Sequence, residues 1–144
     1  MACGWDCSAR DAAYAAYAEA QQLYVEAVER YNNALDLSNQ LAEERGKLTD
    51  LNTHFDSTGA AIQSAGSSIW SEANQATFTR ATDCLKNYGE ALTEAENAVK
   101  TELEAATTEM QQAEVARDNA KAKAESTPCV YNPCPETTTG GARA

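Results

Sequence analysis

The residues of this chain whose types and spacing could support chemistry are its five cysteines. Cys3 and Cys7 have C-x3-C spacing, Cys129 and Cys134 have C-x4-C spacing, and Cys84 lies between the two pairs. Such thiols could bind zinc, form disulfides in an oxidising compartment, or stay reduced and without a role. Zinc-binding cysteines usually have C-x2-C spacing, so the sequence gives a metal site the least support.

The single histidine, His54, is the other candidate for chemistry. One imidazole cannot build a His-rich metal site, and a Cys–His nucleophilic pair would need Cys84, far along the second predicted helix. Acidic residues such as Glu96, four residues before Lys100, fit solvated helix faces. No phosphate-binding loop or nucleophile elbow is present. We therefore predict a protein that is not an enzyme, with no catalytic residues, no metal and no cofactor.

Composition excludes further classes of function. The 144 residues correspond to one domain at most, with 22 acidic and 11 basic side chains, a net charge of −11 and a pI near 4.4. A chain this acidic repels nucleic acid and anionic membrane surfaces. No window approaches the roughly 18–20 apolar residues of a membrane span, and the first residues do not have the pattern of a cleaved signal peptide.

Two segments show the three–four alternation of apolar residues that is typical of a helix packed against another helix. The first stripe comprises Tyr14, Tyr17, Tyr24, Val28, Tyr31, Leu35, Leu41, Leu48, Leu51 and Phe55. The second comprises Phe78, Ala81, Leu85, Tyr88, Leu92, Ala95 and Val99. It continues through Leu103, Ala106, Met110 and Ala113 after one additional four-residue step, a local stutter.

These stripes predict an all-α fold, a long antiparallel two-helix hairpin of coiled-coil type over residues 1–126. Ser8 and Asp11 resemble a capping box, so the first helix is expected over about residues 8–56. A turn is expected over 57–67, with Gly59 as the stop signal, and the second helix over about 68–126. Residues 127–144 are rich in Cys, Pro and Thr and are predicted to form a flexible, disordered tail. No strand is expected.

The stretch SIWSEANQATF, from Ser68 to Phe78, joins the two predicted helices. Trp70 stands where the second helix is expected to begin, and Phe78 follows eight residues later, with Ala76 between them. Both rings could simply clamp the tip of the hairpin. The arrangement also resembles the small helical hairpins of type VII secretion systems, the WXG family. It is closer still to the hairpin partners of LXG toxins, in which a W-x-G turn is followed by an aromatic residue on the second helix.

The resemblance covers about residues 8–124, with motif identity at Trp70, Ala76 and Phe78, the expected turn and partner-binding residues. Glu72 replaces the motif glycine, and the family's secretion signal has no good match, because Tyr131 is followed at the required spacing by Pro135. The resemblance implies a non-enzymatic accessory protein that binds the helical targeting region of a larger secreted, LXG-like toxin. It further implies a cytoplasmic protein before export, then secreted or at the cell surface without a cleaved signal peptide.

Two other functions stay open. The chain could be a structural coiled-coil protein that binds itself, or a small protein that handles thiols or metal through its terminal cysteines. In all cases the expected partner is a helical protein, a different chain or a second copy, and neither nucleic acid nor a membrane span is involved.

The hairpin allows two ways of pairing the four terminal cysteines. If the chain turns near Ile62, residues at equal distances from the turn lie opposite each other, which brings the two ends of the chain together. Cys3 and Cys7 could then form a clasp with Cys129 and Cys134. The alternative is local closure, Cys3–Cys7 and Cys129–Cys134. We favour the clasp in an oxidising compartment.

Overall fold

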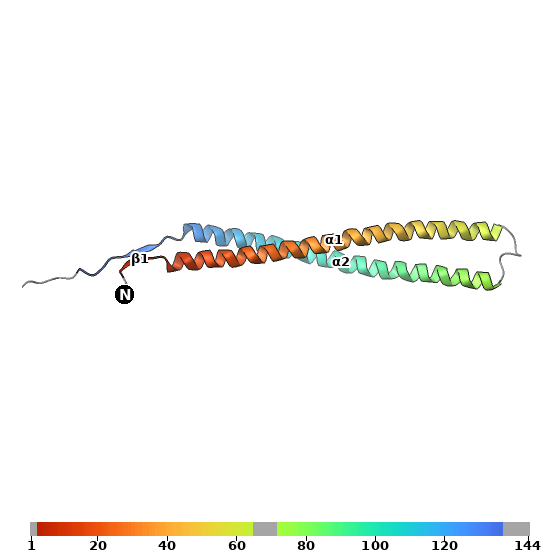
Figure 1. Cartoon of the computed structure of the whole chain (residues 1–144), viewed down its shortest axis with the longest axis horizontal. Helices are drawn as coiled ribbons and strands as arrows, with labels where there is room; N and C mark the ends of the chain where they lie inside the picture. Colours follow the sequence, from red (N-terminus) through yellow and green to blue (C-terminus); the bar gives the residue numbers. More distant parts are fainter. Residues whose placement is uncertain (1–2, 65–71, 137–144) are drawn as a thin grey trace, which may run out of the picture. The chain divides into compact units, whose positions relative to one another are not determined.

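The computed structural model describes residues 3–64 and 72–136. Four elements follow one another along the chain: β1 (Gly4–Asp6), α1 (Ser8–Ser64), α2 (Glu72–Ser126) and β2 (Val130–Asn132). The helices α1 and α2 run side by side in opposite directions (Figure 1). The predicted antiparallel two-helix hairpin is therefore confirmed.

Two helix ends lie where the sequence predicted them, and a third does not. Helix α1 begins at Ser8 and α2 ends at Ser126, as expected. Helix α1 continues to Ser64, so the predicted end at residue 56 is wrong. Gly59 does not stop the helix, because it has no positive φ and stays within the helical run. The predicted start of the second helix at 68 lies outside the described residues.

Two short strands correct the expectation of no strand and of a flexible tail from residue 127. Strand β2 pairs antiparallel with β1, in the register Gly4↔Asn132, Trp5↔Tyr131 and Asp6↔Val130. An isolated pair of three-residue strands is marginal in water, so covalent links beside it are needed to hold it. Residues 137–144 lie outside the described part of the chain.

Contacts within the chain divide it into two compact units. The first unit consists of Met1–Val28 and Thr108–Ala144, and the second is Glu29–Thr107. Each unit contains one segment of α1 and one segment of α2. Neither described helix has the length and hydropathy of a membrane span.

In the first unit the contact between the helices is lined by alternating small and aromatic residues. Ala13, Tyr17, Ala20, Tyr24 and Ala27 follow one another on α1 at steps of four and three residues. Ala13 and Ala27 are buried, and the tyrosines between them are half-buried. Alanine lets two helices approach closely, and a tyrosine ring covers the edge of the contact while its hydroxyl reaches solvent. The predicted stripe included the two tyrosines of this seam and left out its three alanines.

The guanidinium of Arg117 covers the outer side of this aromatic row. Its carbon lies 4.1 Å from the centroid of the Tyr24 ring, in cation–π geometry. Arg117 also forms ion pairs with Asp118 and Glu114 on its own helix. The contact between Tyr24 and Arg117 joins the two helices of the first unit.

In the second unit the seam keeps the same seven-residue repeat, with buried Ala34 and Leu48 on α1 and buried Leu92 and Ala106 on α2. Gly89 faces Leu48, since a Cβ built on this glycine would lie 3.5 Å from the Leu48 Cδ2 atom. The seam of α2 therefore follows a continuous four–three alternation and needs no stutter. Its members are Leu85, Gly89, Leu92, Glu96, Val99, Leu103 and Ala106.

Tyr88 was assigned to the seam by the sequence pattern, and the structure corrects this assignment. Its side chain is 47% exposed, and Gly89 occupies the seam position instead. Similarly, Tyr14, Leu35 and Leu51 of the predicted stripe of α1 are exposed. The pattern was misleading because apolar residues occupy both the seam and the row beside it.

A polar layer interrupts the seam of the second unit. Arg45 of α1 forms an ion pair with Glu96 of α2, and its Nε donates to Glu96 Oε1 at 2.9 Å. Its Nη2 donates to the hydroxyl of Thr93, also at 2.9 Å. Shifting one helix along the other would break these bonds, so the layer favours this register over others, as single polar residues do in coiled coils.

Two stacked rings pack next to a glycine near the end of α1. Phe55 and Phe78 have centroids 4.6 Å apart and an angle of 13° between their planes. A Cβ on Gly59 would overlap Cζ of Phe78 and lie 2.8 Å from its Cε2. Gly59 is thus required for space rather than for backbone conformation.

This space requirement predicts opposite effects of the same substitution at two helical glycines. Gly46→Ala should stabilise the protein by about 1 kcal/mol, because no atom lies within 4 Å of the added Cβ and alanine is the better helix former. Gly59→Ala should destabilise it by about 1–2 kcal/mol, because overpacking against the Phe78 ring outweighs that gain. Urea unfolding followed by circular dichroism measures both. Equal stabilisation by the two substitutions would contradict the packing of Phe78 on Gly59.

Candidate functional site

The four terminal cysteines form two disulfides that join the ends of the chain. Cys3 is bonded to Cys134 and Cys7 to Cys129, with Cα atoms 4.7 and 4.3 Å apart and sequence separations of 131 and 122 residues. The structure therefore contains the cross-terminal clasp and not local closure within each pair. We call β1, β2 and these two bridges the terminal clasp.

The strands lie between the two bridges. Trp5 and Tyr131, which are partners in the strand pair, also contact each other through their rings, with centroids 5.3 Å apart. Both rings are largely exposed. The carboxylate of Asp6 accepts hydrogen bonds from the backbone N–H and the hydroxyl of Ser8, which lower the pKa of Asp6. Asp6 thus caps the start of α1, the role that the sequence gave to Ser8 with Asp11.

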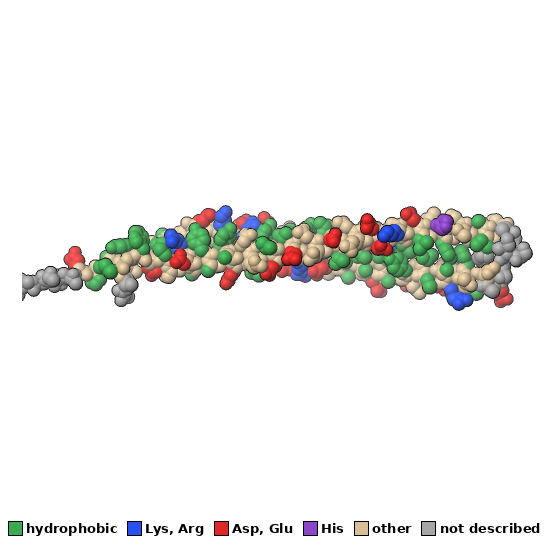
Figure 2. Space-filling view, in the orientation of Figure 1, with side chains coloured by type: hydrophobic (Ala, Val, Ile, Leu, Met, Phe, Trp, Pro, Cys, Tyr) green, Lys and Arg blue, Asp and Glu red, His purple; other side chains and the backbone are tan. Residues whose placement is uncertain are grey.

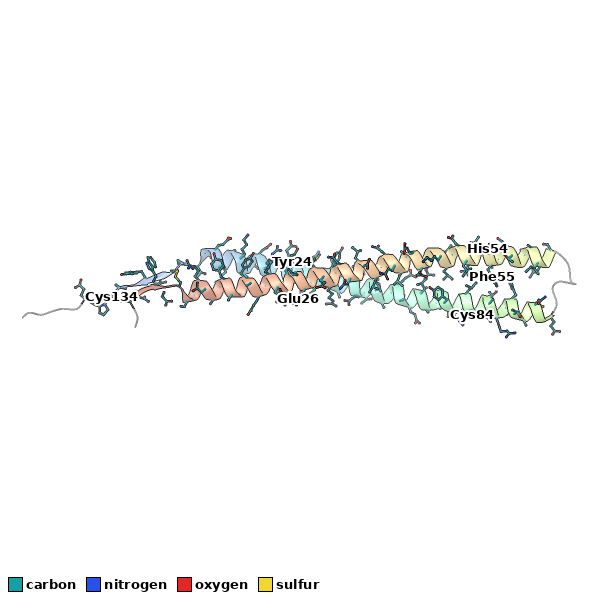
Figure 3. The ribbon with its side chains drawn as sticks, in the orientation of Figure 1. Tyr24, Glu26, His54, Phe55, Cys84 and Cys134 are labelled. Carbon is teal, nitrogen blue, oxygen red and sulfur yellow. A yellow bond between two sulfur atoms is a disulfide. The ribbon has the colours of Figure 1, made fainter. Side chains whose placement is uncertain are left out.

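Because four cysteines are in disulfides, one free thiol remains among the described residues. Disulfide sulfurs are not thiolate ligands, and the one free thiol there, Cys84, is exposed on α2. No group of three or more His, Cys, Asp and Glu side chains that could hold a metal ion occurs among these residues. His54 lies exposed on α1, on a different helix from Cys84 (Figure 3).

The motif residues of the WXG resemblance have different positions. Trp70 lies outside the described residues. Ala76 is exposed in the second turn of α2. Phe78 is half-buried against Phe55 and Gly59, and so belongs to the contact between the helices. Of the two motif residues that the structure describes, only Ala76 is exposed.

A second surface, which the sequence analysis missed, lies beside the seam of the second unit. Two contacts locate it: Arg30 Nε donates to Glu102 Oε1 at 2.7 Å, and the Tyr88 hydroxyl donates to Glu44 Oε2 at 3.2 Å. Arg30 and Glu44 are two heptads apart on α1, as Tyr88 and Glu102 are on α2. These contacts therefore join two rows of residues, one on each helix, along the same flank.

The same register places apolar residues opposite each other between the polar contacts. One heptad from Arg30 and Glu102, Leu37 of α1 faces Ala95 of α2. One heptad beyond Glu44 and Tyr88, Leu51 faces Ala81. Leu37 and Leu51 are 49% and 50% exposed, and the two alanines are half-buried. This flank thus alternates between polar contacts and exposed apolar pairs.

A third row widens the apolar area on α2. On the side of Tyr88 and Ala95 that faces away from the seam, α2 carries Cys84, Ala91, Ala98 and Ala105, which are seven residues apart. All four are exposed, and none is charged or bears an amide. We call the combined surface the lateral face. It consists of Leu37, Leu51, Ala81, Tyr88, Ala95 and the row Cys84, Ala91, Ala98 and Ala105.

On the opposite flank of the second unit, the α2 side is polar, whereas the α1 side carries Leu35, which is exposed. The α2 residues of this flank include Lys86, Thr93 and Lys100 at the position beside the seam, and Asp83 and Glu90 one position further around. A cavity of about 350 Å³ on this flank has mixed walls, formed by the polar side chains of Ser38, Glu96, Asn97 and Lys100 and the apolar side chains of Leu41, Ala42 and Val99. On α2, the residues beside the seam are therefore charged mainly on this flank, whereas those of the lateral face are mainly uncharged.

Figure 2 shows acidic, basic, polar and hydrophobic side chains interspersed along the face of the molecule turned to the viewer. The pKa of Glu44 is lowered mainly by the hydrogen bond that Lys47 donates to it, and further by the hydrogen bond from Tyr88. The hydrogen bond from Arg30 lowers the pKa of Glu102. Both groups are thus ionised at neutral pH. The hydrogen bond to Glu44 raises the pKa of Tyr88, because it favours the protonated phenol.

The terminal clasp predicts unequal effects of removing one or both bridges. Closing a loop of more than about 100 residues is worth about 5 kcal/mol in the chain-entropy model. Once one bridge is closed, the other closes only a short additional loop, worth about 3 kcal/mol. Either paired replacement, Cys3→Ser/Cys134→Ser or Cys7→Ser/Cys129→Ser, should therefore cost about 3 kcal/mol, and all four replacements about 8 kcal/mol.

Urea unfolding without reductant measures these costs, and a Cys84→Ser variant is the matched control for loss of a thiol alone. Additive losses of equal size would show that the bridges do not share one loop. Peptide mapping that finds Cys3–Cys7 or Cys129–Cys134 would contradict the clasp directly.

The cross-helix contacts also predict how stability depends on pH. Glu44 and Glu102 have lowered pKa values in the folded state, so their contribution is complete above the ordinary Glu value of 4.5 and is lost as pH falls through the lower values. Tyr88 has a raised pKa, so its contribution is complete below the ordinary value of 10.0 and is lost as pH rises through the raised value.

Urea midpoints of the wild type and of Glu44→Gln/Glu102→Gln, compared from pH 3 to 7, test the acidic limb. The double variant should lose less stability on acidification, and high salt should reduce the difference, since these groups are exposed. Identical acid profiles would show that neither contact forms in solution.

Comparison with protein-family models, curated proteins and solved structures finds no match to this chain.

Proposed function

We propose that this protein is a non-enzymatic accessory protein that binds a helical segment of a larger secreted protein. The observation that carries the proposal is the apolar surface that lies beside the seam of the second unit. The lateral face exposes Leu37, Leu51 and Tyr88, each about half accessible, and on α2 it extends over the uncharged row Cys84, Ala91, Ala98 and Ala105. Apolar surface of this extent beside a helix seam is typical of a site where another helix packs.

The terminal clasp supports a location outside the reducing cytosol. Disulfides persist in oxidising compartments, and the two bridges of this chain join its ends. A protein that leaves the cytosol and binds helical targets fits the type VII secretion systems, in which hairpin partners accompany LXG toxins. The hairpin fold and the position of Phe78 near the junction of the helices are the features in favour of this assignment.

Purification from the native host with a tag on this chain tests the proposal. We expect one larger protein with a helical region to co-purify in fixed stoichiometry. Deletion of the gene for this chain should lower export of that protein at least tenfold, and re-expression should restore it. A defined homo-oligomer with no second chain, and unchanged export of every secreted protein, would instead identify a self-associating structural coiled-coil protein.

A further inference from the structure

We propose that the terminal clasp is a two-step redox latch, opened by a protein dithiol, that controls whether the open end of the hairpin is ordered. The bridge Cys3–Cys134, here called the outer bridge, is reduced first and releases the strand pair. The bridge Cys7–Cys129, the inner bridge, is reduced second and releases the ends of the two helices. This inference goes beyond the proposed function, since the latch operates whichever protein the chain binds.

The two bridges differ in how accessible they are to a reductant. Both cysteines of the outer bridge are exposed, whereas both cysteines of the inner bridge are half-buried. Figure 3 shows Cys134 beyond the ends of the helices. A dithiol reduces a disulfide by direct attack of its thiolate on sulfur, so the rate depends on access to that sulfur. The outer bridge should therefore react before the inner bridge.

The inner bridge is the one attached directly to the helices. The carbonyl oxygen of Cys7 accepts a hydrogen bond from the backbone N–H of Asp11 at 2.8 Å, so the helical hydrogen bonding of α1 reaches back to Cys7. Cys129 follows Ser126, the last residue of α2, by three residues. The inner bridge thus joins the start of α1 to the end of α2, and the outer bridge lies on the far side of β1 and β2.

The strand pair between the bridges is weak by itself. Each strand has three residues, and an isolated pair of this length is marginal in water. The rings of Trp5 and Tyr131 contact each other, but both remain largely exposed, so their contact buries little apolar area. Opening the outer bridge leaves the pair tethered on one side only. The strands should then separate while the inner bridge still holds the helices together.

The helix ends of the first unit are also weakly packed. Among its described residues, the buried apolar side chains are those of Ala13, Ala27 and Ala124, and each contributes little apolar area. The second unit instead buries Leu48 and Leu92. Helix ends with few buried apolar contacts open at a low free-energy cost. Loss of both bridges should therefore open the first unit more than the second.

Each step of the latch is a thiol–disulfide exchange with a dithiol supplied by another protein. A thiolate of this dithiol attacks one sulfur of the bridge, the S–S bond breaks, and the departing cysteine sulfur takes up a proton. The second thiol of the reductant then loses its proton and attacks the mixed disulfide, which releases the other cysteine as a thiol. Two electrons and two protons pass to the bridge, and the reductant leaves as a disulfide.

Trapping of thiols during reduction tests the order of the two steps. The disulfide-bonded protein is mixed with an excess of reduced thioredoxin, a protein dithiol. Samples are quenched with N-ethylmaleimide over time and mapped by mass spectrometry. Alkylated Cys3 and Cys134 should appear at least tenfold faster than alkylated Cys7 and Cys129. Cys84 is the internal control, because its exposed free thiol should be alkylated equally in every sample.

A matched variant, Cys7→Ser/Cys129→Ser, keeps only the outer bridge. Its outer bridge should be reduced no more slowly than that of the intact protein, because access to this bridge does not require the inner bridge to open first. A tenfold slower reduction in this variant would contradict the proposed order.

Hydrogen exchange tests what each step releases, in the intact protein, in Cys3→Ser/Cys134→Ser and in a variant with serine at all four clasp positions. In the two-serine variant, amides of residues 4–6 and 130–132 should exchange at least tenfold faster than in the intact protein, with smaller changes in the helices. In the four-serine variant, residues 8–28 and 108–126 should exchange at least tenfold faster than in the two-serine variant, with a smaller change in residues 29–107.

Three results would overturn the inference. The first is reduction of the inner bridge before the outer bridge or together with it. The second is exchange in the four-serine variant that rises equally along both helices or not at all, because the clasp would then not act on the open end of the hairpin. The third is loss of helix content in that variant by circular dichroism, since the clasp would then be required for the fold itself.

Discussion

A two-helix hairpin has a single seam, and the rest of this structure depends on that constraint. Each helix can bury about two of every seven residues against one neighbour. In this chain several of the buried positions are alanine, including Ala13, Ala27, Ala34 and Ala106. Such a seam brings the helices close together but removes little apolar area per residue, so stability must also come from elsewhere.

Covalent and polar contacts supply the additional constraint. The terminal clasp prevents the open ends of the hairpin from fraying, where no third element could hold them. Arg45 and Glu96 form a polar layer within the second unit and fix the alignment of the helices there. Because one polar layer is satisfied in only one register, it contributes specificity more than net stability. The stacked rings of Phe55 and Phe78 form a further contact between the two helices of the second unit.

The same constraint accounts for the lateral face. Once the seam is filled, any further apolar residue lies on a flank and stays exposed until something covers it. On α2 the charged residues beside the seam of the second unit lie mainly on one flank, so its exposed uncharged residues collect on the other. Contacts such as the one from Tyr88 to Glu44 hold this flank in a defined geometry. Preorganisation of that kind would lower the entropy lost if another helix bound there.

Much of this was determined by the sequence alone: two helices, the first residue of α1 and the last of α2, and an acidic chain with stripes suited to helix–helix contact. These features follow from helix propensity and from local periodicity, which need no knowledge of the rest of the fold. Periodicity limits the buried face of a helix to one side, but neighbouring rows on that side look alike in sequence. The choice of Gly89 over Tyr88 for the seam depended on what α1 presents opposite, namely Leu48 and the register of Arg45 with Glu96. The helical state of Gly59 and the pairing of residues 130–132 with 4–6 were likewise decided by tertiary structure. At Gly59 the helix continues and the missing side chain leaves space for Phe78, and the strand pair depends on two bridges between segments more than a hundred residues apart in sequence.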